Sequence, residues 1–441
     1  MSDEVMRAAL ADATDTRDVA VGRGAIAEAG ERITAHLPGP YILVADESTW
    51  AVAGEEVTDS LIRAGAVVGE PLIFPARPAV YASYDNCERI RDHIGPGATG
   101  VAVGSGTLND LVKLASHENG RGYAVVGTAA SMDGYTGFGA PMSQDGVKVT
   151  RGCPAPVVAV LDLDVVSAAP ASLTASGYGD LAAKIPGGAD WILADVTGVE
   201  PIRQSVWRTV QSGVAEALSR PDDLAAGKAD AFDGLVRGLV LSGLAMQAYA
   251  GTRPASGAEH YFSHLWELAH LGAELDPPLS HGYKVAIGSL AMCAFYEALL
   301  ERDLSLIDLD RVTSGRSAWP TIEADIRSKF DGALADHAVR ETKVKYLAGE
   351  PLKQRLVPIV TDWEGVSRRL RGQLVTTATL AGMLRRAGAP SRPEDIGLSA
   401  EDVRSTFPRA MYYRSRYTAL DVAWELGIFD DVVEDAFSRW G

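Results

Sequence analysis

Apolar and polar positions follow two different patterns along the chain. Up to about residue 165, short apolar runs typical of strands alternate with amphipathic stretches typical of helices, such as 57–66 and 87–94. The apolar runs are YILVAD (41–46), PLIF (71–74), TGVAVG (99–104), GYAVVG (122–127) and VVAVLDLD (157–164). This order predicts a mostly parallel sheet with helices on both faces.

After about residue 170 long helical patterns dominate, among them FDGLVRGLVLSGLAMQAYA (232–250). The join (165–180) is rich in alanine, serine and glycine, as domain boundaries often are. We therefore predict an α/β domain over 1–168 and an all-helical domain over 169–441. The apolar run 285–300 is shorter than the roughly 20 residues of a membrane-spanning helix, so it predicts a core helix and no membrane insertion.

Charge and cysteine content narrow the classes of partner. The formal net charge of the 441 residues is −17, which argues against nucleic acid and anionic membrane surfaces but not against a small phosphorylated substrate. Three scattered cysteines, Cys87, Cys153 and Cys293, are too few for a disulfide framework or a cysteine metal site. These features, and an N-terminus without a signal-peptide pattern, predict a cytoplasmic protein.

The segment VAVGSGTLNDLVKLAS (101–116) reads as a strand, a glycine turn and a helix. Gly104 and Gly106 allow a tight turn and a close ligand approach. Thr107 and Leu108 would then open a helix whose free N–H groups attract a phosphate. The segment predicts a dinucleotide pyrophosphate site, with an ordinary strand-to-helix turn as the alternative, because the GxGxxG fingerprint is missing.

A second glycine-rich loop, GTAASMDGYTGFG (127–139), follows the next predicted strand. It contains the hydroxyl residues Thr128, Ser131 and Thr136 beside an isolated acid, Asp133. Because ligands of open α/β sheets bind beyond the carboxyl ends of the strands, two such loops together favour a nucleotide site.

Asp46 ends the first apolar run, YILVAD. An acid at such a strand end can accept hydrogen bonds from the ribose hydroxyls of NAD and repel a 2′-phosphate. The alternative is a helix or turn cap, and the sequence does not separate the two interpretations.

Four of the eight histidines, His260, His264, His270 and His281, lie within 22 positions of one another. His260 and His264 are four apart and share one helix face. Two prolines then break the helix, so the chain must restart near His281. Histidines from two neighbouring helices can converge, and imidazole is the commonest metal ligand.

An acid is needed to complete such a site. Asp180 in SGYGDLAAK (176–184) follows two glycines, where we expect the start of a helix. Asp180 with two histidines would suit a divalent metal that acts as a Lewis acid. The alternative is an acid that stabilises the helix dipole.

Five motifs occur in an order and spacing that resemble the sn-glycerol-1-phosphate dehydrogenases, and most closely their bacterial branch, the AraM-like enzymes. They are GSGTLND (104–110), TAASMDGYTG (128–137), GYGDLAAK (177–184), GAEHYFSH (257–264) and SHGYKVAIG (280–288). The family belongs to the superfamily of iron-containing alcohol dehydrogenases, glycerol dehydrogenases and dehydroquinate synthases. The tail RSRYTALDVAWELG (414–427) is also similar, but we can assign it no chemistry.

The resemblance implies a dehydroquinate synthase-like fold and reduction of a small phosphorylated ketone by NAD or NADP, with dihydroxyacetone phosphate to sn-glycerol 1-phosphate as the leading reaction. It implies one divalent metal (Zn or Ni) on Asp180, His260 and His281, with Asp180, His264 and Asp133 facing the substrate. The positions that would contact the dinucleotide are Asp46, Gly104, Gly106, Thr107, Leu108, Asn109, Asp110, Thr128, Ala129, Ala130, Ser131 and Gly137. A homo-oligomer, dimer or larger, is expected.

Two positions depart from the family pattern, and other functions stay open. Gly137 stands where a serine usually contacts the cofactor, and Tyr283 where HGEKV-type sequences carry an acid. Lys184, Arg253 and Lys284 are candidates for binding a substrate phosphate, or else are solvated surface charges. The alternatives are a dehydrogenase of another polyol or hydroxyketone, a sugar phosphate cyclase of the dehydroquinate synthase type, and an inactive NAD-binding scaffold.

Overall fold

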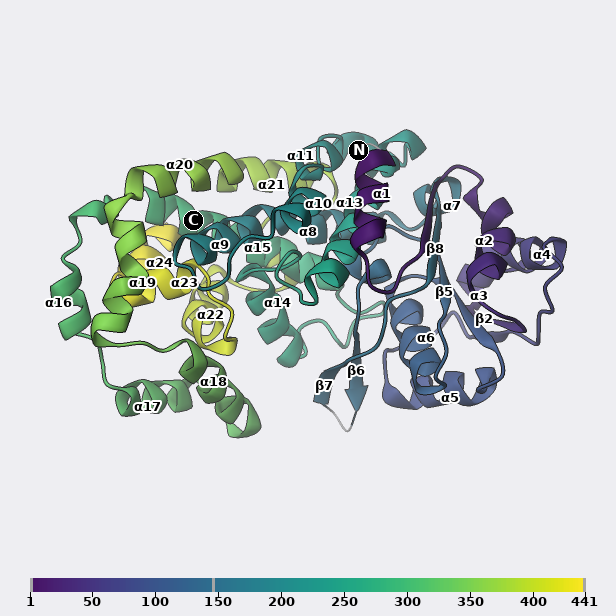
Figure 1. Ribbon diagram of the computed structural model, residues 1–441, viewed down its shortest axis with the longest axis horizontal. Helices are drawn as coiled ribbons and strands as arrows, with labels where there is room; N and C mark the ends of the chain where they lie inside the picture. The colour runs from purple at the N-terminus through teal and green to yellow at the C-terminus, as the bar shows by residue number, and fades with distance from the viewer. Residues whose placement is uncertain (1–2, 145–146, 439–441) are drawn as a thin grey trace.

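The computed structural model describes residues 3–144 and 147–438, and its first half is built on a parallel sheet. Six strands pair in the order β1-β8-β5-β4-β2-β3, and every pairing is parallel. A separate antiparallel hairpin, β6–β7, extends beside the sheet (Figure 1). The strands are β1 (Asp18–Gly22), β2 (Tyr41–Asp46), β3 (Leu72–Phe74), β4 (Thr99–Gly104), β5 (Ala124–Gly127), β6 (Ala140–Gln144), β7 (Val147–Arg151) and β8 (Val158–Asp162).

Successive side chains of the central strands enter two separate apolar cores, one on each face of the sheet. In β4, Val101 and Val103 belong to one core, whereas Ala102 between them belongs to the other. Helices α5 and α6 cover the Ala102 face, and η1, α2 and α4 cover the opposite face. Because both faces are buried, the strands read as continuous apolar runs. The helices of this half are α1 (Asp3–Asp12), η1 (Ala25–Glu28), α2 (Ala29–His36), α3 (Glu47–Thr49), η2 (Trp50–Gly54), α4 (Glu55–Arg63), α5 (Tyr84–Ile94), α6 (Gly106–Glu118), η3 (Asp133–Thr136) and α7 (Leu163–Ser167).

Every strand expected from an apolar run is present, and three further strands were not expected. β8 ends at Asp162 instead of residue 164, because the Asp162 side chain accepts a hydrogen bond from the Asp164 N–H and caps α7. The unexpected strands are β1 and the two strands of the hairpin, β6 and β7. β1 lies at the sheet edge, where it pairs with β8 alone.

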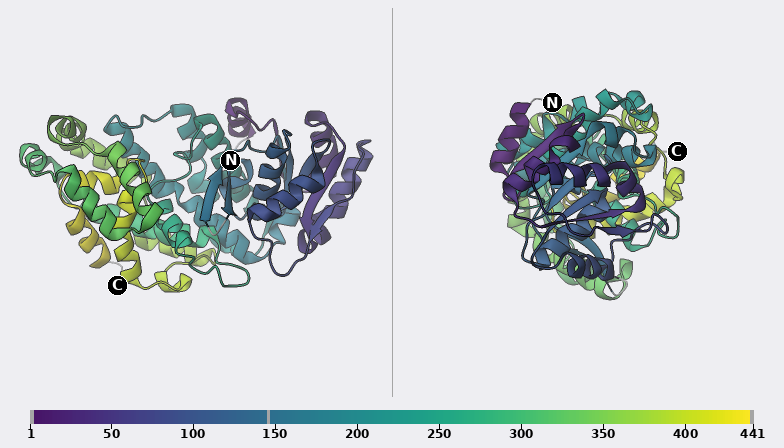
Figure 2. Two further views of the ribbon diagram at one scale, coloured as in Figure 1. Left: turned by 90° about the horizontal axis from the view of Figure 1, so that it is seen from below. Right: turned by 90° about the vertical axis from the view of Figure 1, so that its right-hand side faces the viewer.

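Helices alone make up the second half: no strand follows β8 among the described residues. Figure 2 shows this half at the opposite end of the long axis from the sheet. The division at residues 168 and 169 stays a prediction, and α1 packs against α13 of the helical half. The helices are α8 (Ala171–Ala182), α9 (Lys184–Val196), α10 (Gln204–Gln211), α11 (Val214–Ala217), α12 (Pro221–Ala225), α13 (Ala229–Tyr249), α14 (Glu259–Leu268), α15 (His281–Leu300), η4 (Leu304–Leu306), α16 (Leu309–Ser314), α17 (Trp319–Lys329), α18 (Gly332–Lys345), α19 (Gly349–Thr361), α20 (Trp363–Gln373), α21 (Thr377–Arg386), η5 (Pro393–Ile396), α22 (Ala400–Tyr413), α23 (Ala419–Glu425) and α24 (Phe429–Ser438).

The central helix of this half is α15, which packs against α8, α14, α21 and α24. It has 20 residues, more than its apolar run predicts, because Ser280 caps the helix and brings His281 and the next three residues into its first turn. Its length and apolar composition are those of a membrane-spanning helix, but 89% of its most apolar window is buried inside the protein. Burial therefore identifies α15 as a core helix, whereas the length argument from sequence was wrong.

Candidate active site

The two glycine-rich loops lie at the carboxyl edge of the sheet, beside the point where the strand order reverses. From β2 the chain continues outward to β3, whereas from β4 it proceeds the other way to β5 and β8. Gly104 at the end of β4 is paired with Gly127 at the end of β5. A crevice between oppositely progressing strands is where open α/β sheets bind ligands. This crevice lies between the ends of β2 and β4.

The glycines of the first loop pack closely against side chains of the protein itself. A Cβ atom at Gly104 would lie 2.5 Å from Cδ1 of Leu108, and one at Gly106 would lie 2.7 Å from Cε of Met132. The helix begins at Gly106, one residue before the predicted start at Thr107. Its first residue therefore has no side chain, and Ser105 is its N-cap.

The polar residues of this loop bind the second loop. The Asn109 side chain donates to the Gly134 carbonyl (3.3 Å) and accepts from the Tyr123 hydroxyl (2.9 Å). Buried Lys113, which the sequence analysis did not select, donates to Asp110 (3.1 Å) and to the carbonyls of Gly134 and Gly139. These bonds hold the two loops together. A dinucleotide contact of Asn109 or Asp110 stays a prediction.

The second loop also contacts the helical half. Thr128 donates from its backbone to Gly104 (3.1 Å), and buried Ala129 and Ala130 lead to Ser131, whose carbonyl accepts from Ser176 of α8 (3.0 Å). Thr136 donates to the Val240 carbonyl of α13 (2.7 Å). The loop thus connects the nucleotide edge to α8, the helix that carries Asp180.

Asp46 and Gly137 have defined places in the structure. Asp46 Oδ1 accepts from the Thr49 N–H (2.8 Å) and caps α3, as the structural interpretation of this residue expects. Its contact with a ribose stays a prediction. A Cβ at Gly137 would lie 2.9 Å from Cε of Met246, so a serine at this position requires the methionine side chain to move.

Asp180, His260 and His281 converge from three helices. A carboxylate oxygen of Asp180 and one ring nitrogen from each histidine all lie within 4.8 Å of one another. α8 supplies Asp180, α14 supplies His260, and α15 begins with His281, where the sequence predicts the helix to restart. Closely packed glycines allow α8 and α15 to approach, since a Cβ at Gly282 would overlap the Ser176 carbonyl.

The expected position of Asp180 at a helix start was wrong. Asp180 lies near the C-terminal end of α8, where the helix dipole disfavours a negative charge. The carboxylate is held instead by the backbone N–H of Asp133 on Oδ2 (2.9 Å) and by the Lys184 ammonium, 3.5 Å from Oδ1. The dipole-stabilising alternative is therefore excluded.

A carboxylate lies beside each of the two histidines of the cluster. Glu259 Oε1 lies 2.9 Å from Nδ1 of His260, and Glu267 Oε1 lies 2.7 Å from Nδ1 of His281. With Nδ1 engaged in each ring, the Nε2 atoms are left for a ligand, an arrangement common around metal-bound histidines. The sequence analysis missed both acids, although Glu259 directly precedes His260 and Glu267 follows His264 on the same helix.

The donor set fits a divalent cation. Asp180 Oδ1 is fully buried and has no hydrogen-bond partner among the described residues. Burial raises the pKa of Asp180, but Lys184 and the two histidines outweigh it and leave the pKa well below its usual range. Burial lowers the pKa of His260, whereas the neighbouring carboxylates of Asp180 and Glu259 raise it to about 9. One carboxylate and two imidazoles with open positions are typical of a catalytic metal site.

His264 lies beside the cluster without joining it. Its ring is stacked on that of His281 at a centroid distance of 5.9 Å, and it is also 5.9 Å from the His260 ring. Its Nδ1 atom is buried and has no hydrogen-bond partner among the described residues. Burial, followed by the charge of Arg414, lowers the pKa of His264 well below its usual value, so the imidazole is neutral.

The three cations suggested for a substrate phosphate are all buried, so their interpretation as solvated surface charges was wrong, whereas phosphate binding by them stays a prediction. Lys184 is completely buried and lies 2.7 Å from Asp133 Oδ2, which also accepts from Ser242 (2.7 Å). Arg253 donates to the carbonyls of Asp190 and Tyr417, and Lys284 donates to that of Leu279. These contacts connect the three cations to the fold around the site.

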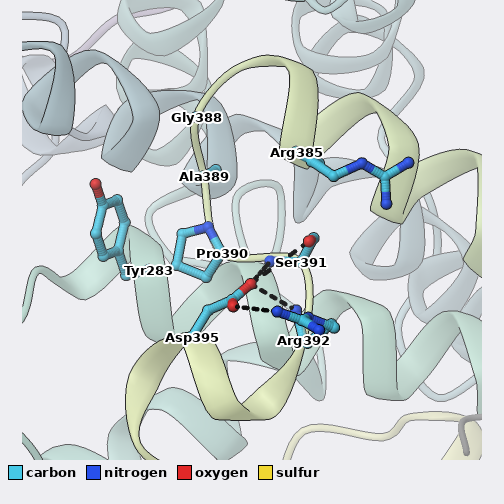
Figure 3. A pocket seen from close by; sticks show the side chains of 8 residues that line it. All are labelled: Tyr283, Arg385, Gly388, Ala389, Pro390, Ser391, Arg392 and Asp395. Atoms are coloured by element: carbon cyan, nitrogen blue, oxygen red, sulfur yellow. Dashed lines mark hydrogen bonds and ion pairs between the residues drawn. The ribbon is translucent and has the colours of Figure 1, made fainter.

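Tyr283 lies apart from the cluster. Side chains two positions apart on a helix do not face each other, so Tyr283 points away from His281. It lines a surface pocket with Arg385 and the segment 388–392, which Asp395 holds by bonds to Ser391 and Arg392 (Figure 3). The departure at Tyr283 therefore concerns this pocket and leaves the metal-binding residues unaffected.

Known proteins match both halves of the chain. A family model of iron-containing alcohol dehydrogenases matches residues 20–170. The glycerol-1-phosphate dehydrogenase (NAD(P)+) of Halalkalibacterium halodurans is 35% identical over 258 residues, which are 58% of this chain and 64% of that enzyme, a little under two thirds of its length. The enzyme of the same name from Methanococcoides burtonii is 31% identical over 63% of this chain and 75% of its own length.

Solved structures show the same fold over nearly the whole chain. Glycerol dehydrogenase from Schizosaccharomyces pombe superposes with a TM-score of 0.61 at 17% identity, covering 97% of this chain and 92% of that one. At this identity the likeness concerns the fold alone. It confirms the predicted combination of a parallel α/β part and a helical part.

Proposed function

Because the chain belongs to the glycerol-1-phosphate dehydrogenases of the iron-containing alcohol dehydrogenase family, we propose that it catalyses the metal-dependent reduction of a small phosphorylated ketone by NADH or NADPH. The substrate we propose is dihydroxyacetone phosphate, and the product sn-glycerol 1-phosphate. The observation that carries the proposal is the convergence of Asp180, His260 and His281 within 4.8 Å, connected by the loop 127–139 to a nucleotide-type sheet edge.

One group of residues would bind the metal and the dinucleotide, and a second group orients the side chains of the first. Asp180, His260 and His281 would bind one Zn or Ni ion, and the loops after β4 and β5 would bind the dinucleotide. When bound, the metal polarises a ketone carbonyl and the nicotinamide donates a hydride. Glu259 and Glu267 keep both rings turned with Nε2 toward the cluster, so the geometry exists before the ion arrives.

His264 is the group that we assign to proton transfer. Its Nδ1 atom is buried without a partner, so Nε2 is the ring atom that can exchange a proton with the substrate oxygen or a water molecule. Low pKa keeps the ring neutral, with one N–H donor, while the adjacent rings of His260 and His281 fix its orientation. Histidine in such a position typically contributes a 10²–10⁴-fold rate effect, as an order of magnitude.

Asp133 and Lys184 position Asp180. The Asp133 backbone holds Oδ2 of Asp180, and its side chain holds the Lys184 ammonium, which in turn donates to the Asp180 carbonyl (3.0 Å). This closed set of contacts supports a fixed carboxylate orientation. A direct substrate contact of Asp133, a homo-oligomeric assembly and a cytoplasmic location remain parts of the proposal.

The test is a ketone panel with the purified enzyme. Oxidation of NADH or NADPH is followed by absorbance with dihydroxyacetone phosphate, dihydroxyacetone and other small ketones. Chelation should abolish activity, and Zn or Ni should restore it. Equal turnover of dihydroxyacetone and its phosphate would favour a dehydrogenase of unphosphorylated polyols. Full activity in a preparation shown by elemental analysis to be metal-free would contradict the proposal.

A further inference from the structure

The tail motif that begins at Arg414 lies behind the histidine cluster. Its first residue follows α22, and α22 packs between α14, the helix of His260 and His264, and α18 (Figure 1). The motif therefore starts beside the helix face that the proposed function uses.

Tyr413 connects this segment to the cluster. Its ring centroid is 6.3 Å from that of His264, with the rings nearly perpendicular at 65°. The guanidinium carbon of Arg414 lies 5.4 Å from the same ring centroid, and His337 of α18 lies 5.7 Å from it. Arg414 and His264 thus both neighbour the Tyr413 ring, which lies between the guanidinium and the proposed proton-transfer residue.

Arg414 differs from Lys184, Arg253 and Lys284 because its N–H groups form no hydrogen bond or ion pair within the described residues. Within residues 3–144 and 147–438, no carboxylate forms an ion pair with it and its side chain makes no hydrogen bond. Its side chain is nevertheless only half exposed. The nearby Glu341 carboxylate accepts instead from the Ser415 N–H (2.9 Å). A partly buried guanidinium that makes no hydrogen bond and no close ion pair within the described residues has its donors available for an anionic ligand.

We infer that Arg414 binds the phosphate group of the ketone substrate and thereby selects phosphorylated over unphosphorylated ketones. The inference rests on the proposed function and names the specificity-determining residue of that site. The planar fork of a guanidinium suits the oxygens of a phosphate, and the Tyr413 ring beneath it limits its motion. In a protein of net charge −17, a dianion needs such a local cation.

The surface pocket of Figure 3 is the rival phosphate site. It also presents two arginines, Arg385 and Arg392, but Arg392 is already bound to Asp395 (3.4 Å). Its wall at Tyr283 turns away from His281 by the helix geometry given above.

The experiment compares Arg414→Met with two matched arginine variants in the metal-loaded enzyme. Arg404→Met removes another arginine of α22, which is paired with Glu434 and lies at the surface, and Arg385→Met removes the rival. KM and kcat are measured for dihydroxyacetone phosphate and for dihydroxyacetone. Arg414→Met should raise KM for the phosphorylated ketone about 10–100-fold, the usual effect of losing hydrogen bonds to a charged group, and leave KM for dihydroxyacetone within about 2-fold. Arg414→Lys should fall between.

Binding of inorganic phosphate to the same holoenzymes, measured by calorimetry, gives a readout independent of turnover. Wild type, Arg404→Met and Arg385→Met should bind it, and Arg414→Met should not, while all four unfold at similar temperatures. If wild type reduces the phosphorylated ketone and Arg414→Met has unchanged kinetics, the inference is wrong and the proposed function stands. If wild type reduces neither ketone, the proposed function is wrong, and the phosphate titration alone then tests whether Arg414 binds phosphate. Equal binding by wild type and Arg414→Met, loss in Arg385→Met instead, or no binding to wild type overturns the assignment.

Discussion

The sheet edge and the histidine cluster satisfy their buried polar groups in opposite ways. At the sheet edge, Asn109 and Thr136 find partners within the protein. In the cluster, Asp180 Oδ1, Glu259 Oε2 and His264 Nδ1 are buried without a hydrogen-bond partner among the described residues. Because such atoms are rare in folded proteins, their concentration indicates a place that a ligand completes. At the sheet edge, these polar groups have partners within the protein, whereas in the cluster three polar atoms have none among the described residues.

The largest effect should follow removal of Asp180. Two neutral imidazoles alone make a poor divalent site, so Asp180→Ala should contain almost no metal, and its activity should fall to background. Metal excess should stabilise wild type by about 2.7 kcal/mol at a concentration of 100 times Kd, but not the variant. Elemental analysis and thermal unfolding with and without metal measure this. Asp195→Asn, on the next helix, serves as the control. If Asp180→Ala has a full metal content, the cluster is not a site that the metal completes, and the contrast with the sheet edge is lost.

His264 and His260 should separate metal binding from turnover. His260→Ala should lose metal and activity together. His264→Ala should keep its metal and lose about 10²–10⁴-fold in kcat or substrate affinity, because its ring lies outside the convergent donor set. Metal content and steady-state kinetics of both variants decide this. If His264→Ala is metal-free while His260→Ala retains its metal, the two roles are assigned in reverse.

Replacing a carboxylate that contacts one of the proposed metal ligands should have a smaller effect than replacing the ligand itself. Glu267→Gln removes the anion beside Nδ1 of His281 while conserving its shape. Metal affinity should fall about 10–100-fold, with kcat preserved once metal is saturating. Competition with a chelating dye measures the affinity, and Glu274→Gln, an exposed acid in the following loop, is the control. An unchanged affinity would mean that the histidine geometry is set by helix packing alone.

At the sheet edge, Asp46→Asn should change cofactor preference without changing stability. Asparagine caps a helix about as well as aspartate, so the α3 cap should survive, while repulsion of a 2′-phosphate is lost. The ratio of kcat/KM for NADH over NADPH should fall by up to about tenfold, as one removed charge–charge repulsion of about 1.4 kcal/mol allows. Asp46→Ala should in addition lose about 1 kcal/mol of stability. A constant cofactor ratio in both variants would leave Asp46 as a cap only.

Gly137→Ser should have the smallest effect. The added Cβ meets the flexible end of Met246, which can move aside, so the free energy of unfolding should change by less than about 1 kcal/mol. If a hydroxyl here assists the cofactor, KM for NADH or NADPH should fall. Gly137→Ala adds the same Cβ without the hydroxyl and is the control. A rise in KM with serine would show that this loop follows another path around its ligand.

The fold was predictable because periodicity reports burial, and both faces of this sheet are buried. The runs over β2, β4 and β5 stand out for this reason, whereas β1 and the hairpin lie outside the doubly covered centre and give a weak signal. The restart at His281 was predictable from the prolines before it. The place of Asp180 was not, because its glycines read as a helix start, although Gly177 packs against Ala130 of the second loop and Gly179 against α15.

At the site, the residues that converge could be predicted from the sequence, but the residues that orient them through hydrogen bonds could not. Histidine spacing and the family motifs led to Asp180, His260 and His281. Glu267 and Lys113 act through contacts between elements, which no local pattern reveals, whereas Glu259 contacts its neighbour on the same helix. Conversely, Lys184 and Arg253 read as surface charges because lysine and arginine are rarely buried, and only tertiary pairing explains their burial.

The central position of α15 has a consequence for how the chain is made. Its partners α8 and α14 precede it in the sequence, but α21 and α24 follow it, and α24 ends at Ser438. On the ribosome, one side of this membrane-like apolar helix therefore stays uncovered until well over a hundred further residues have been synthesised. During that interval α15 is a natural substrate for chaperones that bind apolar segments. Shortening the chain before α24 should produce aggregation before it produces any loss of metal binding.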